Sequence, residues 1–134
     1  MKKILPFLVV LTACASPTGT GSDPLSGTRW SLVSIGGSPV LASESTSMQF
    51  DKGRLSGSDG CNRYSTSYVA SEQGLKVGPN IAGTRMACAP PVMEEAKIFI
   101  EILDRTTGYR RDGERMTLLD GGGRPLANFR RMQP

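Results

Sequence analysis

Three cysteines, Cys14, Cys61 and Cys88, are the residues of this sequence with the most distinctive chemistry. A thiol can carry a lipid, form a disulfide, bind a metal or act as a nucleophile, and the surrounding residues decide which of these is favoured. The sequence contains no histidine. It therefore excludes a histidine general base, a Ser-His-Asp triad and zinc sites that use histidine ligands.

Cys14 follows a segment with the features of an export leader. Lys2 and Lys3 form a positive start, residues 4–11 form a short apolar run, and small residues stand directly before Cys14. The apolar run is too short to span a bilayer core, which takes roughly 20 helical residues. The arrangement resembles a bacterial lipobox, which predicts removal of a signal peptide (residues 1–13) and acylation of Cys14 with chains such as palmitate. The alternative is an ordinary signal peptide with an incidental cysteine.

Residues 14–27 are predicted to be the lipidated N-terminus and a flexible tether, because this stretch is rich in Ser, Gly, Thr and Pro. Two or more acyl chains would anchor the protein stably to a membrane. In Gram-negative lipoproteins an Asp directly after the cysteine favours the inner membrane, and here that residue is Ala15. We therefore expect an outer-membrane lipoprotein of the cell envelope that faces the periplasm.

Cys61 and Cys88 then remain as an even pair in an oxidising compartment, which favours a structural disulfide. In the chain-entropy model a loop of this length is stabilised by roughly 3–4 kcal/mol. A redox-active pair or two free thiols are the alternatives. Two isolated thiolates without histidine are too few ligands for a metal, so we expect no metal and no cofactor.

The charged residues give little indication of catalysis or of nucleic-acid binding. Asp51, Asp59 and Glu72 could supply a carboxylate pair, but surface carboxylates are far more common in a strand-rich domain, and we predict that the protein is not an enzyme. Without the leader's two lysines the net charge of +4 falls to +2, which argues against a nucleic-acid partner. Several arginines could form a basic patch. Because acidic residues lie between them, we expect a solvent-exposed face of mixed charge instead. These arginines are Arg105, Arg110, Arg111, Arg115, Arg130 and Arg131.

Residues 28–134 have the pattern of one small strand-rich domain, with short apolar runs separated by Gly and Pro. Trp30 and Leu32, for example, alternate with Arg29 and Ser31, as in a half-buried strand. Strands are predicted at residues 28–35, 46–51, 54–57, 62–69, 75–77, 109–111, 116–119 and 126–132.

Residues 90–105 change to a helical period. One stripe of the predicted helix carries Val92, Ala96, Phe99, Ile100 and Leu103, and the charged residues lie away from it. Two prolines suit the first helical positions. We expect this helix to cover one face or mouth of the sheet; a partner-binding helix is the alternative.

Several segments, taken in order, carry a family likeness. Trp30-Ser31-Leu32 is followed by Gly60-Cys61-Asn62, then by Thr84-Arg85-Met86-Ala87-Cys88 and Leu118-Leu119-Asp120. This order resembles the META/HslJ domain of bacterial envelope lipoproteins and heat-inducible proteins, from about residue 25 to the C-terminus. The second and third segments, with the tryptophan upstream, are the most specific.

The resemblance implies a single small α+β domain with a curved, partly barrel-like antiparallel sheet and one principal helix. It implies that Cys61 and Cys88 are spatial neighbours and that Gly60 and Asn62 have structural roles in a tight turn. Asn can supply either a left-handed backbone or an amide that bonds nearby backbone. The resemblance brings no established activity and no catalytic residue. It associates the domain with heat-shock and envelope-stress responses, with novobiocin resistance and, in some parasites, with motility or virulence.

Our leading hypothesis is a noncatalytic envelope lipoprotein that supports envelope integrity or stress and antibiotic tolerance by contacting an envelope protein. The alternative is a periplasmic binding module that inhibits an exported hydrolase such as a protease or lysozyme. Small disulfide-stapled β domains suit that task, because a rigid loop loses little entropy on binding. Its candidate contact loops are residues 78–85 and 120–125.

Overall fold

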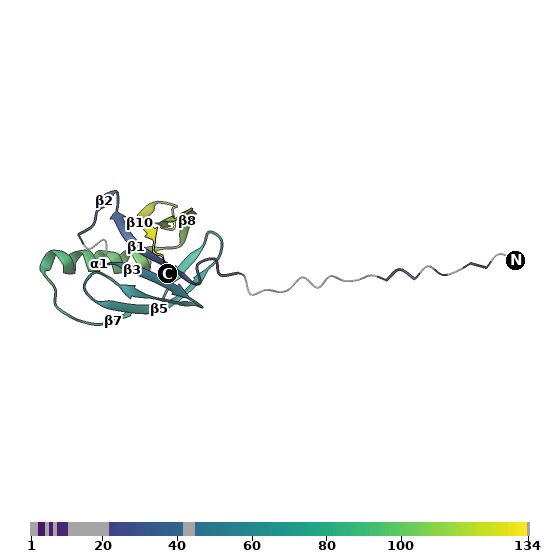
Figure 1. Ribbon diagram of the computed structural model, residues 1–134, viewed down its shortest axis with the longest axis horizontal. Helices are drawn as coiled ribbons and strands as arrows, with labels where there is room; N and C mark the ends of the chain where they lie inside the picture. Colours follow the sequence, from purple (N-terminus) through teal and green to yellow (C-terminus); the bar gives the residue numbers. More distant parts are fainter. Residues whose placement is uncertain (1–2, 5, 7, 11–21, 42–44, 134) are drawn as a thin grey trace.

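The computed structural model describes residues 3–4, 6, 8–10, 22–41 and 45–133 of the chain (Figure 1). Antiparallel strands and one helix make up the described elements. In chain order they are β1 (Thr28–Ile35), β2 (Ser38–Pro39), β3 (Ser47–Asp51), β4 (Arg54–Ser58), β5 (Arg63–Ala70), β6 (Leu75–Val77), β7 (Ala82–Gly83), α1 (Pro90–Arg105), β8 (Gly108–Asp112), β9 (Arg115–Leu119) and β10 (Pro125–Arg131). Within the described ranges, no helix has the length and apolar character needed to cross a membrane.

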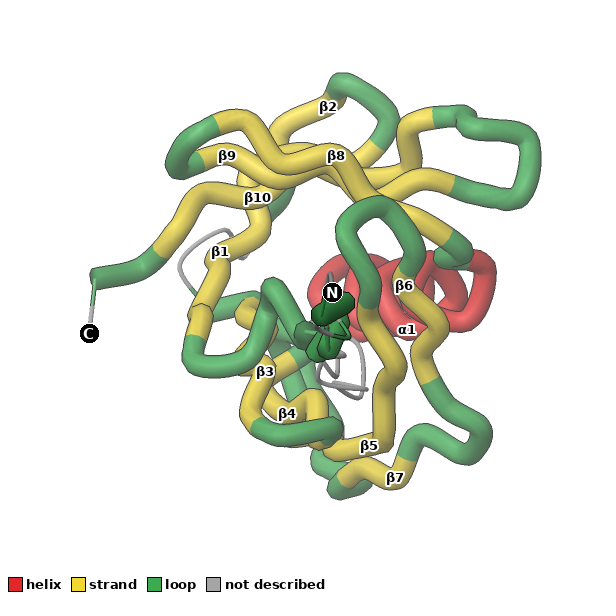
Figure 2. The backbone as a smooth tube through the Cα atoms, turned by 90° about the vertical axis from the view of Figure 1, so that its right-hand side faces the viewer, coloured by secondary structure: helices red, strands yellow, loops and turns green. Residues whose placement is uncertain are grey.

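The strands form one sheet in the order β6-β5-β4-β3-β1-β10-β9-β8, with β2 added beside β1 and β7 beside β5. The two ends of this path meet: the backbone N–H of Leu75 donates to the carbonyl of Thr107 (3.1 Å), and that of Tyr109 donates to the carbonyl of Gln73 (3.0 Å). Figure 2 shows the sheet curling around on itself. The result is a nearly closed barrel.

The interior of the barrel is filled by the side chains that alternate inward along the strands. Trp30 and Leu32 are buried on β1, as their alternation with Arg29 and Ser31 predicts, and Tyr64 and Tyr68 are buried on β5. The Trp30 indole N–H finds a partner inside the core, the hydroxyl of Thr28 at 2.8 Å. Burial of this aromatic and aliphatic set is the main force that stabilises the domain.

Helix α1 packs its buried face against the core of the barrel. Phe99 reaches the ring of Tyr64 on β5 (centroids 5.7 Å apart) and the ring of Phe129 on β10 (6.3 Å apart), so one helical side chain joins two distant strands. The buried stripe is Ala96, Phe99, Ile102 and Leu103. The predicted stripe included Ile100 and left out Ile102; the structure buries Ile102 and leaves Ile100 half-buried.

The predicted fold class, a small α+β domain with a curved antiparallel sheet and one principal helix, is confirmed. The predicted tether differs from the structure at its end, because the folded domain begins before Gly27. Leu25 is fully buried. The Asp23 carboxylate accepts the backbone N–H groups of Leu25 (3.1 Å) and Ser26 (3.2 Å) and the hydroxyl of Tyr68. One leucine within a Ser- and Gly-rich stretch was too weak a sequence signal to reveal this packing.

Candidate functional site

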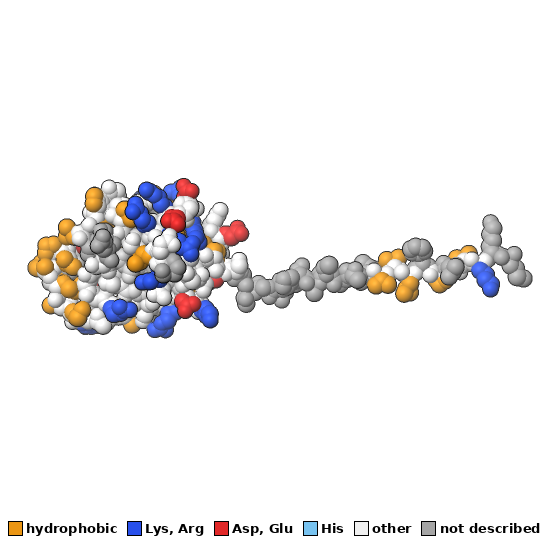
Figure 3. All heavy atoms as spheres, viewed as in Figure 1, with side chains coloured by type: hydrophobic (Ala, Val, Ile, Leu, Met, Phe, Trp, Pro, Cys, Tyr) orange, Lys and Arg blue, Asp and Glu red, His pale blue; other side chains and the backbone are white. Residues whose placement is uncertain are grey.

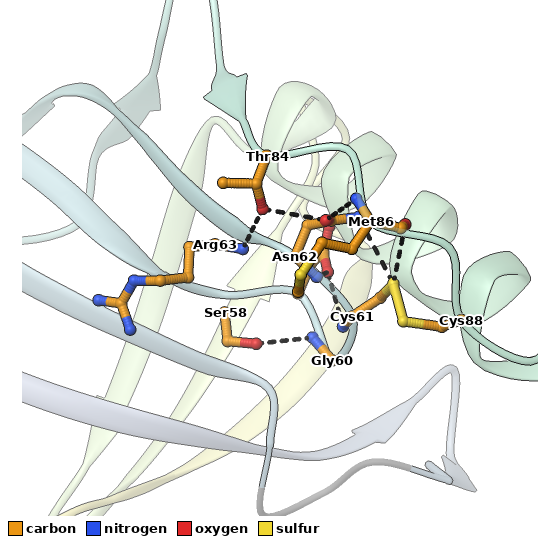
Figure 4. The surroundings of a disulfide bond; sticks show 9 residues. Ser58, Gly60, Cys61, Asn62, Arg63, Thr84, Met86 and Cys88 are labelled. Atoms are coloured by element: carbon orange, nitrogen blue, oxygen red, sulfur yellow. Dashed lines mark hydrogen bonds between the residues drawn. A yellow bond between two sulfur atoms is a disulfide. The ribbon is translucent and has the colours of Figure 1, made fainter.

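A tight turn between β4 and β5 contains the predicted residues Gly60 and Asn62 (Figure 4). The Asp59 carboxylate accepts the backbone N–H groups of Cys61 (2.9 Å) and Asn62 (2.6 Å), which is the geometry of an Asx turn. Gly60 adopts a φ of +100°, a conformation that favours glycine. The turn is therefore fixed by one carboxylate and one glycine.

The side chain of Asn62 joins this turn to the chain 22 residues further on. Its Oδ1 atom accepts the backbone N–H of Met86 (2.6 Å) and the hydroxyl of Thr84 (2.9 Å), and its Nδ2 donates to the carbonyl of Met86 (3.4 Å). Arg63 and Thr84 add two further bonds beside it. Asn62 acts through its amide and not through a left-handed backbone, since the described non-glycine residues with positive φ are Lys52 and Asn80.

A disulfide between Cys61 and Cys88 completes this attachment, with a Cα–Cα distance of 6.0 Å. Asn62 holds the start of residues 84–88 and the disulfide holds their end. We call this arrangement the clamp: Asp59, Cys61, Asn62, Thr84 and Cys88. It fixes a segment that otherwise has no helix or strand of its own.

The segment held by the clamp presents an exposed apolar side chain. Met86 is 58% exposed, and Met93 on the first turns of α1 is 45% exposed. A depression of about 180 Å³ between the disulfide and α1 is lined by Cys61 and Met93 among others. Figure 3 shows apolar side chains gathered over the end of the domain where α1 begins in Figure 1, opposite the end where the chain enters the domain. We call the surface formed by Met86 and Met93 the apolar end.

Sequence reasoning did not single out Met86 or Met93. Methionine is an ordinary core residue, and strand or helix periodicity cannot show that a methionine in an irregular segment is exposed. The available signal was the position of Met86 two residues before a cysteine, inside one of the segments that carried the family likeness.

The two predicted contact loops are also held by side-chain bonds. In residues 78–85, the carbonyls of Gly78 and Asn80 accept the hydroxyls of Ser67 (3.0 Å) and Thr66 (3.3 Å) on β5. In residues 120–125, Asp120 accepts the backbone N–H groups of Gly122 and Arg124, both at 2.9 Å. The bond from Arg124, aided by nearby arginines, lowers the pKa of Asp120 below its ordinary value.

The candidate carboxylates do not form a site together. Asp59 belongs to the turn, Asp51 ends β3 in a hairpin opposite Arg54, and Glu72 is exposed between β5 and β6. Among the described residues, no group of three or more acidic or cysteine side chains is arranged to hold a metal ion.

The arginines considered for a basic patch separate into several groups. Arg105 pairs with Asp120 at 3.9 Å, and Arg111 lies over the ring of Trp30, 5.3 Å from its centroid. Arg110, Arg115 and Arg130 instead line one depression on the outer face of the sheet. The structure therefore gathers three of the six in one place.

The buried tyrosine hydroxyls are structural groups. Burial, with a smaller contribution from Asp59, raises the pKa of Tyr64, whose hydroxyl donates to the carbonyl of Ser47 at 2.7 Å. Burial and the bond to Asp23 raise the pKa of Tyr68 to about 12. Both hydroxyls stay protonated at neutral pH and act as hydrogen-bond donors. The predicted lipidation site, Cys14, lies outside the described residues.

The chain is similar to several proteins of known structure. A protein solved by NMR is 27% identical, with a TM-score of 0.61, over 79% of this chain and 90% of that chain. A protein from Burkholderia xenovorans, also solved by NMR, is 26% identical, with a TM-score of 0.63, over 82% of this chain and 85% of that chain. The crystal structure of a DUF4847 family protein from Bacteroides vulgatus ATCC 8482 is 16% identical, with a TM-score of 0.59, over 80% of this chain and 94% of that chain, and shares the fold alone. No curated protein matches the chain.

The family comparison agrees with the likeness seen in the sequence. The META domain family matches residues 23–133, a range that includes Asp23 and its hydrogen bond to Leu25. The match spans the turn, the clamp and the helix. This chain belongs to the META domain family.

Proposed function

We propose that the protein is a noncatalytic envelope lipoprotein whose apolar end contacts another envelope protein, and that this contact supports envelope integrity under stress. The single observation that carries the proposal is the clamp. It holds the backbone of an irregular segment in one conformation, and that segment carries an exposed methionine. Protein contacts are favoured by such surfaces, because apolar side chains are buried on binding and a fixed backbone loses little entropy.

The position of the apolar end fits a tethered protein. The chain enters the domain at one end, and the start of α1, which carries Met93, lies at the other with the segment before it (Figure 1). A lipid on Cys14 would hold the first end toward the membrane. The apolar end would then face away from that membrane, where an envelope partner is accessible.

Methionine suits such a surface chemically. Its unbranched, polarisable side chain adapts to the shape of a partner, and methionines are enriched in the contact surfaces of proteins relative to the rest of the surface. The backbone beneath Met86 is fixed by hydrogen bonds at 2.6 and 3.4 Å to Asn62, so binding would order the side chain alone.

The anchor is tested by the intact mass of the protein purified from native membranes. We expect a mass that includes acyl chains on Cys14, and we expect Cys14→Ser to release the protein into the soluble fraction. An unacylated mass would remove the lipoprotein part of the proposal.

The contact is tested by complementation of a deletion strain under envelope stress, with novobiocin as one condition. Met86→Asp should fail to restore tolerance, because it places a charge in the contact. Val69→Asp is the matched control, since Val69 is a 75% exposed apolar residue on the outer face of β5. Equal complementation by both variants, at equal protein level, would refute the role of the apolar end.

Inhibition of an exported hydrolase is a second use that the same rigidity favours. The loop of residues 78–85 is bonded to β5 at two carbonyls, so it would lose little entropy on entering an enzyme cleft. Inhibition of a protease or lysozyme that Arg85→Asp abolishes would support this use. No inhibition of a panel of envelope hydrolases at micromolar excess would exclude it.

A further inference from the structure

The outer face of the sheet carries a depression of about 380 Å³ across four adjacent strands. Arg110 on β8, Arg115 on β9 and Arg130 on β10 contribute side chains to its rim. This volume lies within the range of small-molecule sites, about 300–1,000 Å³. The depression is on a different part of the surface from the clamp, and the proposed function does not use it.

The strand register places two of these cations against each other. Arg115 and Arg130 are direct partners across β9 and β10, and Arg110 is paired with Thr117, which puts it diagonal to Arg115. Like charges directly opposite one another destabilise a sheet. An anion bound between them would offset this repulsion.

The nearby carboxylates are too few to neutralise the three guanidinium groups. Asp112 is opposite Arg115 and also lines the depression, so three arginines and one aspartate give a net charge of +2. In the described part of the chain, none of the three arginines makes an ion pair or donates a side-chain hydrogen bond. All three side chains are exposed.

A chain of polar groups between the strands points one more donor into the depression. The Thr117 hydroxyl donates to Oδ1 of Asn128 (2.8 Å), and Nδ2 of Asn128 donates to Oγ of Ser34 (3.0 Å). Because Ser34 accepts in this chain, its own hydroxyl proton is available to a ligand. The register of β1 shifts between Leu32 and Ser34, and such bulges recur beside functional sites, where they redirect side chains.

We propose that this depression binds a phosphate monoester or inorganic phosphate. A guanidinium group presents paired N–H donors that match the oxygens of an anion. A carboxylate ligand has only two oxygens, so one or two guanidinium groups satisfy it. A phosphate monoester offers three terminal oxygens to three arginines and the Ser34 hydroxyl. Val33, 41% exposed at the bulge, supplies an apolar wall for the group esterified to the phosphate. The phosphate of a lipid head group and a soluble phosphate share this chemistry.

The first experiment titrates the full-length protein with inorganic phosphate and follows both the melting temperature and binding heat. We expect a saturable rise in melting temperature. Arg115→Gln should weaken phosphate binding by about tenfold or more, the loss expected for a charge-assisted hydrogen bond. In phosphate-free buffer the same variant should melt at an equal or higher temperature, because it removes one of two opposed charges. A merely structural arginine would not give this combination.

Two further variants make the test specific. Arg63→Gln, on β5 away from the depression, removes the same charge and should leave phosphate binding unchanged. Asp112→Asn removes the negative charge at the rim and should tighten binding. No saturable phosphate effect, or an effect that Arg115→Gln leaves intact, would overturn the proposal.

Vesicles distinguish the two sources of phosphate. Co-sedimentation with phosphatidylcholine vesicles that contain phosphatidic acid, lost with Arg115→Gln and absent with phosphatidylcholine alone, assigns the site to a lipid head group. Phosphate binding without such co-sedimentation assigns it to a soluble phosphate ester.

Discussion

Asn62 uses one amide to hold two parts of the chain together, and it is the residue on which the clamp most depends. Its Oδ1 and Nδ2 atoms make bonds to Thr84 and to both backbone groups of Met86. The family resemblance implied a structural role for Asn62 beside Gly60. It could not indicate the bonding partners, because residues 84–86 approach Asn62 only after the barrel has formed.

Asn62→Ala should lower the free energy of unfolding by about 1–3 kcal/mol, because it leaves the Met86 N–H and the Thr84 hydroxyl without their acceptor. Denaturant unfolding measures this change, and hydrogen exchange should show faster exchange at Met86. Gln73→Ala is the control, since the structure uses the backbone carbonyl of Gln73, which accepts the N–H of Tyr109, and not its side-chain amide. A loss below about 0.5 kcal/mol, the range of ordinary surface substitutions, would contradict the role of Asn62.

At the scale of elements, two features limit which substitutions the domain tolerates: the disulfide and the close contact between β3 and β4. The sequence pattern predicted β1, β6 and α1 with the bounds that the structure has, because β1 and α1 have a clear period of burial and β6 lies between two glycines. It missed β2 and β7, which are two residues long and exposed. Strands of that length have no period, and they form only because a neighbouring strand offers free backbone groups.

Replacing Cys61 and Cys88 together by Ser should lower the free energy of unfolding by roughly 3–4 kcal/mol in the chain-entropy model. Reductant added to the unsubstituted protein should produce a similar loss, which separates the missing bond from the effect of the new side chains. Denaturant unfolding measures both. A change below about 1 kcal/mol would mean that residues 84–88 are held mainly by Asn62.

Gly57→Ala tests the contact between β3 and β4. A Cβ on Gly57 would lie 2.2 Å from the carbonyl oxygen of Ser47, so the two strands would have to separate. We expect a loss of about 1–3 kcal/mol or more, as for other overpacked sites. Gly121→Ala is the control, because its Cβ would meet its nearest neighbour at 4.0 Å. Equal melting temperatures for the two variants would show that β3 and β4 adjust freely.

At the scale of the whole molecule, burial in the barrel favours the protonated state of the tyrosine hydroxyls. Burial is the largest cause of the raised pKa values of Tyr64, Tyr68 and Tyr109. Tyr64 and Tyr68 lie four residues apart on β5, so both side chains are on the buried face of the strand. The closure of the sheet was implied by the family resemblance alone, because no local pattern encodes the meeting of β6 and β8. The burial of Leu25 in the core was not predicted for a similar reason.

Stability should therefore fall at alkaline pH. The pKa of Tyr68 is about 12 in the folded protein and 10.0 for an ordinary tyrosine, so the unfolded chain releases this proton first. The stabilising contribution is complete below pH 10 and is lost as the pH rises from 10 toward 12. Denaturant unfolding across this range should show the decline, and tyrosinate absorbance should lag behind that of the unfolded chain. Ionisation of all three tyrosines at the ordinary value in the folded protein would contradict this prediction.

The central claim is that the clamped, apolar end of the domain contacts an envelope protein. The most direct measurement is photo-crosslinking in the native envelope from a reactive amino acid at position 86, compared with position 69. We predict a defined crosslinked protein from position 86, lost in the variant with both Cys61 and Cys88 replaced, and none from position 69. Crosslinking that is absent at position 86, or equal at the two positions, would contradict the account.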